Sequence, residues 1–220
     1  MNRDIKILND NSVYRLSDIF FAANDIDVQP LMSSDEYKDT ILVEYINKKQ
    51  KFRDWQTLAS ICSDRIASGE YKQPSSDELV LHIRLGDIFI SGKTWMIDES
   101  TKYFEKLITN ISKWTQKYPN QSRVTCVTAH HFGHWCHDMF VQDALAQADN
   151  ILTRIEDECN KINKPVSYKS SSCFDHDFLY MVGADTYIPG YQQGHHKSEK
   201  LGTRLGISTI VQQIHKLIYK

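Results

Sequence analysis

From residue 79 to the C-terminus, short apolar runs alternate with longer amphipathic segments, and this alternation leaves few possible folds. The short runs cover residues 79–84, 123–128, 166–169 and 186–188. Between the second and third runs, apolar residues recur four and three positions apart: Val141, Leu145, Ala148, Leu152, Ile155, Cys159 and Ile162. That spacing predicts an amphipathic helix. Alternating strands and helices predict an α/β fold, a Rossmann-like parallel sheet flanked by helices.

The remaining segments complete the expected layout. Apolar spacing predicts further helices over residues 100–117, 177–182 and 207–219, and in the first third of the chain over 33–48 and 52–68. Gly69 is expected to end the last of these, and residues 73–76 to form a connector. We therefore expect two domains, a reduced, mainly helical region at 1–75 and a Rossmann-like domain at 76–220.

Charge and composition exclude several classes of protein. The formal net charge is −2, whereas nucleic-acid-binding domains usually carry a basic stripe, so no nucleic-acid partner is expected. No stretch approaches the roughly 20 apolar residues of a membrane-spanning helix, and the N-terminus lacks the apolar segment of a secretory signal. The five cysteines are odd in number and include no Cys-x-x-Cys pair, as expected of reduced thiols. These features favour a cytoplasmic protein of a bacterium or a virus-infected host.

The first candidate site follows the first of the short apolar runs. Ligands of parallel α/β sheets bind at the carboxyl ends of the strands. The run 79–84 ends in His82-Ile83-Arg84-Leu85-Gly86-Asp87, where His82 and Arg84 would share one strand face. Gly86 would allow a sharp turn and close approach of a ligand, and a guanidinium suits a diphosphate. The alternative is that Arg84 pairs with Asp87 to hold a turn and that His82 is a core residue.

This motif resembles the donor-site motif of the superfamily of α1,2-, α1,6- and protein O-fucosyltransferases. A second stretch, residues 177–190 followed by Ser198, resembles the second donor motif of the same family. The two motifs have the order and separation of the donor-binding half of a GT-B glycosyltransferase. The resemblance covers about residues 76–220 and makes 1–75 the possible acceptor side.

The resemblance implies a role for each matching residue. Arg84 would stabilise the leaving diphosphate, Asp87 would face the transferred sugar, and His82 would reach the nucleobase or its ribose. Asp177 would accept hydrogen bonds from the guanine edge, while Asp185 would close the short helix that Asp177 starts. The expected substrate-binding set comprises His82, Gly86, His130, Asp177, Asp185, Gly194, His195, His196 and Ser198.

The loop that carries the last four of these residues would meet the diphosphate. Backbone N–H groups and the Ser198 hydroxyl would do so at a helix N-terminus. For both Asp177 and Ser198, a plain helix N-cap is the alternative.

The histidines at positions 130, 131, 134 and 137 allow three interpretations. With Cys136 they resemble metal ligands, but their spacing fits no zinc motif. A loop lining the donor cleft, with His130 in contact with substrate, is favoured over plain loop residues and over a metal site. The triplets Asp25-Ile26-Asp27 and Asp175-His176-Asp177 could hold manganese in a GT-A fold, which is the less favoured alternative.

These observations together predict a metal-independent glycosyltransferase without a cofactor. It would move a sugar, most simply fucose from GDP-fucose, to a glycan or another hydroxyl acceptor. Two alternatives stay open: a metal-dependent hydrolase or deaminase that uses residues 130–137, and a non-catalytic module that binds sugar nucleotides.

Overall fold

The computed structural model describes residues 3–9, 35, 37–51, 53–89, 94–132, 138–171, 173–190, 197–198, 202–203 and 207–219. The chain divides into two compact units. The sheet unit comprises Met1–Val13, Pro74–Ser172 and Ala184–Tyr191, and the helical unit comprises Tyr14–Gln73, Cys173–Gly183 and Gln192–Lys220. This division is interleaved along the chain, so it differs from a single boundary between residues 75 and 76.

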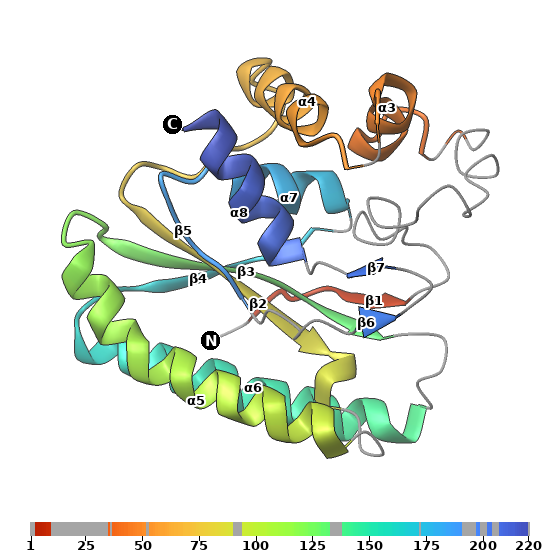
Figure 1. Cartoon of the computed structure of the whole chain (residues 1–220). Coiled ribbons are helices and arrows are strands. Elements are labelled where there is room, and N and C mark those ends of the chain that lie inside the picture. Colours follow the sequence, from red (N-terminus) through yellow and green to blue (C-terminus); the bar gives the residue numbers. More distant parts are fainter. Residues whose placement is uncertain are drawn as a thin grey trace. The chain divides into compact units, whose positions relative to one another are not determined.

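The described part of the sheet unit contains five strands, and every pairing between them is parallel (Figure 1). The strands are β1 (Ile7–Asn9), β2 (Glu78–Gly86), β3 (Arg123–Phe132), β4 (Val166–Lys169) and β5 (Thr186–Ile188). β2 lies between β3 and β5, while β4 and β1 occupy successive lengths of the other edge of β3. From β2 onward the spatial order is β4-β3-β2-β5, the order of a Rossmann-type sheet. The expected parallel α/β sheet is confirmed.

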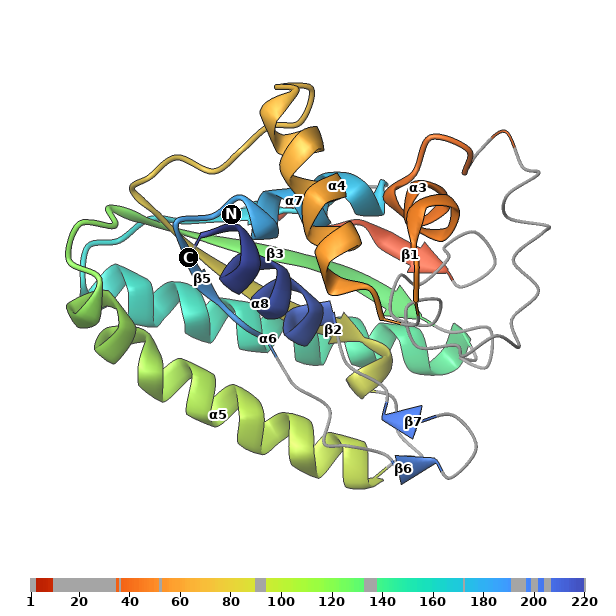
Figure 2. The same cartoon turned by 45° about the horizontal axis from the view of Figure 1, so that its top comes forward.

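Helices α5 (Thr94–Lys117) and α6 (Asp138–Lys161) lie side by side against one face of this sheet (Figure 2). They bury alternate residues of β2: Leu79, Leu81, Ile83 and Leu85. The 3-10 turn η2 (Asp87–Phe89) follows β2, and its Phe89 ring stacks on Phe104 of α5 at 5.4 Å. Apolar residues with a period of two thus meet apolar residues with a helical period, which fixes the register of the strand.

The helical unit contains α3 (Ile41–Lys48), α4 (Trp55–Ala67), α7 (Phe174–Val182), α8 (Ile207–Ile218) and the short hairpin of β6 (Lys197–Ser198) and β7 (Gly202–Thr203). α4 packs against α3, α7 and α8. Fully buried side chains include Leu58 of α4, Phe178 of α7 and Ile210 of α8. The helices expected at 177–182 and 207–219 therefore belong to this unit.

Most of the expected elements form, with changes at their ends. β4 and β5 have the expected bounds, while α5 begins at Thr94 and α7 at Phe174, earlier than expected. β3 continues to Phe132 instead of ending at residue 128. Of the helix expected over residues 33–48, the structure describes α3 from Ile41, where Thr40 caps it by accepting from the Val43 N–H, while residues 33 and 34 lie outside the described part. No helix in the described ranges is both long and apolar enough to cross a lipid bilayer.

Candidate functional site

The order of the strands identifies the place where a ligand would bind. From β2 the chain proceeds to β3 and β4 on one side, whereas β5 lies on the other side of β2. The crevice outside the carboxyl ends of such a strand pair is the usual ligand site of an open α/β sheet. In the sheet unit this point is flanked by Gly86 at the end of β2 and by Pro189-Gly190 after β5.

Gly86 has the backbone conformation that its position in the motif predicts. Its φ is 91°, in the left-handed region that side chains other than glycine rarely adopt. The turn redirects the chain from β2 into η2. The turn therefore carries no Cβ atom at residue 86.

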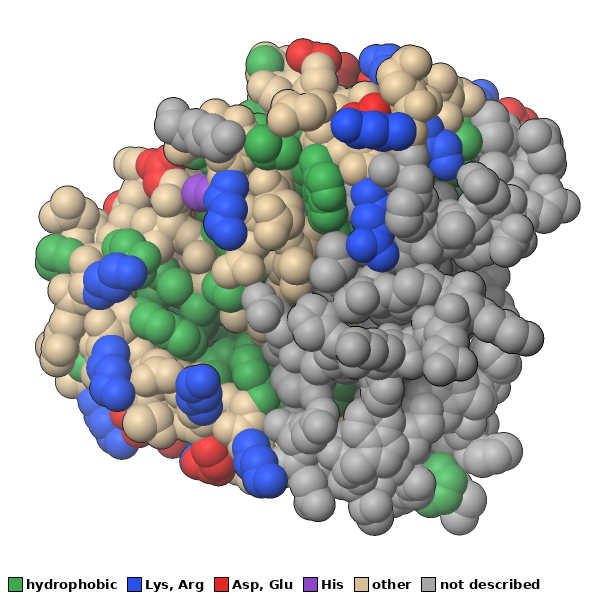
Figure 3. Space-filling model, in the orientation of Figure 1, with side chains coloured by type: hydrophobic (Ala, Val, Ile, Leu, Met, Phe, Trp, Pro, Cys, Tyr) green, Lys and Arg blue, Asp and Glu red, His purple; other side chains and the backbone are tan. Residues whose placement is uncertain are grey.

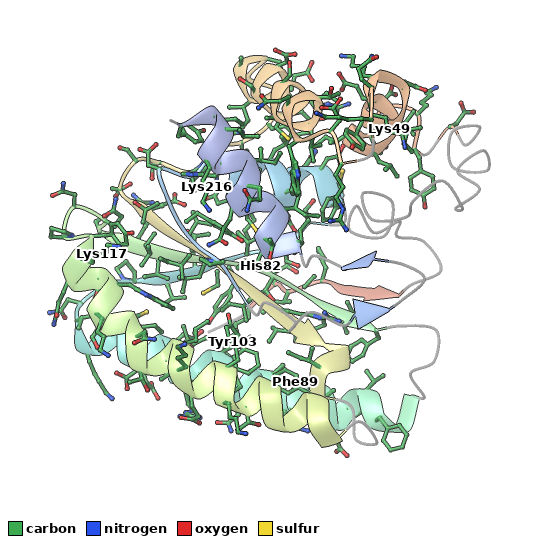
Figure 4. All side chains as sticks on the ribbon, in the orientation of Figure 1. Lys49, His82, Phe89, Tyr103, Lys117 and Lys216 are labelled. Carbon is green, nitrogen blue, oxygen red and sulfur yellow. The ribbon has the colours of Figure 1, made fainter. Side chains whose placement is uncertain are left out.

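His82 and Arg84 share the face of the sheet that lies opposite α5 and α6, as the strand alternation predicts. Leu81, Ile83 and Leu85 point into the α5–α6 core, and the half-buried His82 and Arg84 alternate with them. Figure 4 shows His82 on one side of β2 and both Phe89 and Tyr103 on the other.

Arg84 places a positive charge on this face of β2. Burial, together with the nearby positive charge of Arg84, lowers the pKa of His82 to about 4. The imidazole is therefore neutral at pH 7 and can donate or accept hydrogen bonds without adding charge. The side chain of Asp87 lies outside the described residues, so the expected role of this carboxylate and its alternative pairing with Arg84 both stay predictions.

Gly190 is a close neighbour of His82 that sequence reasoning treated only as the start of a loop. A Cβ atom at Gly190 would lie 2.3 Å from the carbonyl oxygen of His82 and 2.9 Å from its Nδ1. Both distances are shorter than a van der Waals contact, so only glycine fits. The Pro189-Gly190 pair directly after a strand was the available signal.

His130 lies on the other face of the sheet. It is paired in register with Leu85, and both side chains point to the side of α5 and α6. His130 is only 9% exposed, and its Nδ1 has no hydrogen-bond partner among the described residues. Burial lowers its pKa, although Asp149 opposes this shift. The structure therefore does not bring His130 together with Arg84, and it corrects the prediction of a loop at this position.

The rest of the histidine cluster is only partly visible. The side chain of His131 and residues 133–137 lie outside the described part of the chain. Among the described residues, no group of three or more His, Cys, Asp or Glu side chains is placed to hold a metal ion.

Asp185 lies at the wrong end of the sheet for the expected site. It directly precedes β5, whose first residue, Thr186, is in register with Leu79 at the amino end of β2. Leu79 is five residues from Arg84, a distance of about 17 Å at roughly 3.3 Å per residue. The exposed Asp185 carboxylate is thus separated from Arg84 by the length of the strand.

Asp177 does not start its helix. α7 begins three residues earlier, after Cys173, so Asp177 is neither the first residue nor the N-cap. Asp175 is 2% exposed, and its Oδ2 accepts a hydrogen bond of 2.8 Å from the Ile41 N–H and one of 3.4 Å from Arg65. In the triplet Asp175-His176-Asp177, one carboxylate therefore joins α7 to α3 and α4.

The loop residues give one correction. Ser198 lies in β6 and pairs with Gly202 in the hairpin, well before α8 begins at Ile207. It is therefore not at a helix N-terminus. Gly194, His195 and His196 lie outside the described residues, as does the triplet Asp25-Ile26-Asp27.

The helical unit has an open groove of about 660 Å³ between α3 and α4. Arg65 lies in this groove, where it pairs with Glu44 at 2.9 Å and donates to the Tyr71 hydroxyl at 3.0 Å. Glu44 also pairs with Lys48 at 2.6 Å. These basic groups are neutralised by neighbours within the unit, so the groove offers a polyanion little free positive charge.

Figure 3 shows Lys and Arg side chains dispersed among Asp and Glu side chains on the described part of the surface in view, rather than gathered in a stripe.

Comparisons of the chain with protein-family models, with curated proteins and with solved structures find no match.

Proposed function

We propose that the sheet unit binds the diphosphate of a nucleotide sugar at the carboxyl ends of β2 and β5, and that the chain is a fucosyltransferase-like glycosyltransferase of GT-B type. One observation carries this proposal: Arg84 and the left-handed Gly86 lie together at the end of β2, where the strand order reverses. The motif that resembles the fucosyltransferase donor motif therefore falls on the part of the sheet where such folds bind ligands.

The chemistry of Arg84 suits a diphosphate. Its guanidinium keeps its charge at every relevant pH and can donate two parallel hydrogen bonds to phosphate oxygens. Because His82 is neutral at pH 7, it neither competes for the anion nor repels Arg84. Gly86 allows the phosphate to approach the backbone closely.

The proposed reaction is a direct displacement. An acceptor hydroxyl oxygen forms a bond to the anomeric carbon of GDP-fucose while the bond from that carbon to the β-phosphate oxygen breaks. The hydroxyl proton passes to a base, and GDP leaves with the bonding electron pair. Arg84 stabilises the negative charge that develops on the diphosphate, which lowers the barrier only because this interaction is stronger in the transition state.

The corrected site is smaller than the set named from the sequence. Asp185 and His130 are left out because they lie at the opposite end and on the opposite face of the sheet. Asp177 and Ser198 belong to the helical unit, so their roles toward the guanine edge and the diphosphate stay predictions from the sequence.

Ligand-induced stabilisation tests the proposal. GDP at 100 times its dissociation constant should add about 2.7 kcal/mol to the stability of wild-type protein. For a domain of this size that raises Tm by about 5–10 °C. Arg84→Ala should remove this increase, whereas Arg154→Ala, at a surface ion pair with Glu105 on α5, should retain it. UDP serves as the comparison nucleotide.

Transfer from labelled GDP-fucose gives the second measurement. Loss of one charge-stabilising donor typically lowers the rate by about 10²–10³-fold, so Arg84→Ala should be nearly inactive while it keeps its fold. Full activity of Arg84→Ala, or the absence of any Tm increase with GDP and GDP-fucose, would refute the proposal.

A further inference from the structure

We propose that His82 is a positioning residue that seats the chain leaving β5, and that it does not contact the ligand. This inference rests on the proposed function for one point, namely that the seated chain leads into a ligand-binding loop. It departs from the role that the resemblance implies for His82, which is to reach the nucleobase or its ribose.

The path of the chain after β5 supports this role. β5 pairs with β2 at three positions, the last joining Ile188 to Leu81. If pairing continued, residue 190 would lie opposite Ile83. Gly190 instead lies against His82, where a Cβ atom would be 3.0 Å or less from three of its atoms. The chain therefore leaves the ladder and crosses over the His82 residue.

This contact blocks one edge of the imidazole. Nδ1 of His82 faces the buried Gly190 backbone, so a ligand atom cannot approach from that side. Arg84 lies two residues closer to the carboxyl end of the strand, about 7 Å further along. His82 therefore holds the backbone at Gly190, and Arg84 contacts the diphosphate.

The charges on this face are consistent with a neutral, structural imidazole. The same face of the sheet carries Arg84 on β2, Lys169 on β4 and Tyr187 on β5. Glu78 also lies on this face of β2, but it is four residues from His82, about 13 Å along the strand, and accepts hydrogen bonds from Thr125 and Ser75, so it does not favour protonation of His82. Burial and the charge of Arg84 both favour the neutral form.

Histidine NMR on the full-length protein without nucleotide tests the contact directly. In the wild type we expect an NOE between the Hε1 proton of His82 and the Hα protons of Gly190, and a His82 pKa near 4. Gly190→Ala should displace the crossing chain and move the pKa of His82 toward the ordinary value of 6.5. Gly69→Ala, at a left-handed glycine with open space around it in the helical unit, is the matched control and should leave that pKa unchanged.

The outcomes separate this inference from the proposed function. Absence of the wild-type NOE, or an unchanged His82 pKa in folded Gly190→Ala, overturns the positioning role. If Gly190→Ala does not fold, the wild-type NOE alone decides. An intermolecular NOE between the His82 ring and bound GDP also overturns it. Failure of GDP to bind refutes the proposed function and leaves the nucleotide-free measurements, which decide this inference, intact.

Discussion

Three residues at the carboxyl end of β2 and β5 define the candidate site, and each acts through a different physical property. Gly86 supplies a left-handed backbone, Gly190 supplies a surface without a Cβ atom, and Arg84 supplies a permanent positive charge. Gly86 and Gly190 are therefore required because they lack a Cβ atom. A motif read by residue type alone captures Arg84, but the need for Gly190 emerges only from its packing against His82.

Paired glycine substitutions separate backbone strain from loss of the site. Gly86 and Gly69 have φ values of 91° and 75°, so an alanine at either position is strained by about 1–2 kcal/mol. We expect Gly86→Ala and Gly69→Ala to lower the free energy of unfolding by similar amounts in urea titrations. Only Gly86→Ala should also abolish the Tm increase with GDP. A normal GDP response in Gly86→Ala would show that the backbone at residue 86 does not meet the ligand.

The depressed pKa of His82 predicts a pH dependence of stability. In the unfolded chain His82 should titrate near 6.5, and in the folded protein near 4. Between these values the unfolded state binds more protons, so this residue makes stability fall as the pH decreases from 6.5 to 4. Denaturant unfolding at a series of pH values should show a smaller loss over this interval in His82→Gln. Equal slopes for the two proteins would mean that folding does not perturb His82.

At the scale of elements, β4 and β5 were predicted with their correct bounds, whereas β1 was missed in a region that was expected to be mainly helical. Residues 79–81, at the start of β2, are apolar on both strand faces, which signals a buried central strand. β3 was predicted too short because its last residues include His130 and His131, polar residues that resemble a loop, although pairing with β1 and β2 carries the strand through them. α7 was predicted to start late because its N-cap, Cys173, makes no side-chain capping bond.

His130 and Asp185 were wrongly expected beside Arg84, because their positions depend on contacts between distant segments that a single sequence does not reveal. Strand alternation gives the face of His82 relative to Arg84, but not the face of β3 relative to β2. The separation of Asp185 from Arg84 depends on where β5 pairs along β2, and that register is a long-range contact. Arg84 and Gly86 were predictable because they belong to one continuous strand and turn.

Asp175 on α7 joins this helix to α3 and α4 within the helical unit. Its buried carboxylate accepts from the backbone at the start of α3 and from Arg65 on α4. Loss of hydrogen bonds to a charged group costs about 1.5–3 kcal/mol, so Asp175→Asn should lower the free energy of unfolding by that amount. Asp64→Asn, at an exposed position on α4, should change it by less than about 0.5 kcal/mol. Equal effects of Asp175→Asn and Asp64→Asn in urea titration would contradict this role of Asp175.

At the scale of the whole molecule, the two units are interleaved in sequence. The helical unit combines residues from before β2, between β4 and β5, and after β5. A division at residue 75 would remove β1 from the sheet unit and leave α7 and α8 without α3 and α4. The domains expected from the sequence were two continuous stretches of chain. Compact units are instead defined by contacts, which here join segments far apart in the sequence.

Expression of residues 76–220 alone tests this organisation. We expect the fragment to show poorly dispersed amide signals for α7 and α8, because their partner α4 is missing. The full chain provides the reference spectrum. A fragment with the native dispersion and the native Tm would show that residues 1–75 form an independent domain.

An amide chemical-shift map of the full chain titrated with GDP shows directly whether the carboxyl ends of β2 and β5 meet the nucleotide. We expect saturable perturbations that are largest at Leu85, Gly86 and Gly190, the residues at the carboxyl ends of β2 and β5, and that vanish in Arg84→Ala. Perturbations confined to the amino end of the sheet near Asp185, or to the groove between α3 and α4, would contradict this expectation, as would a map that is the same in Arg84→Ala.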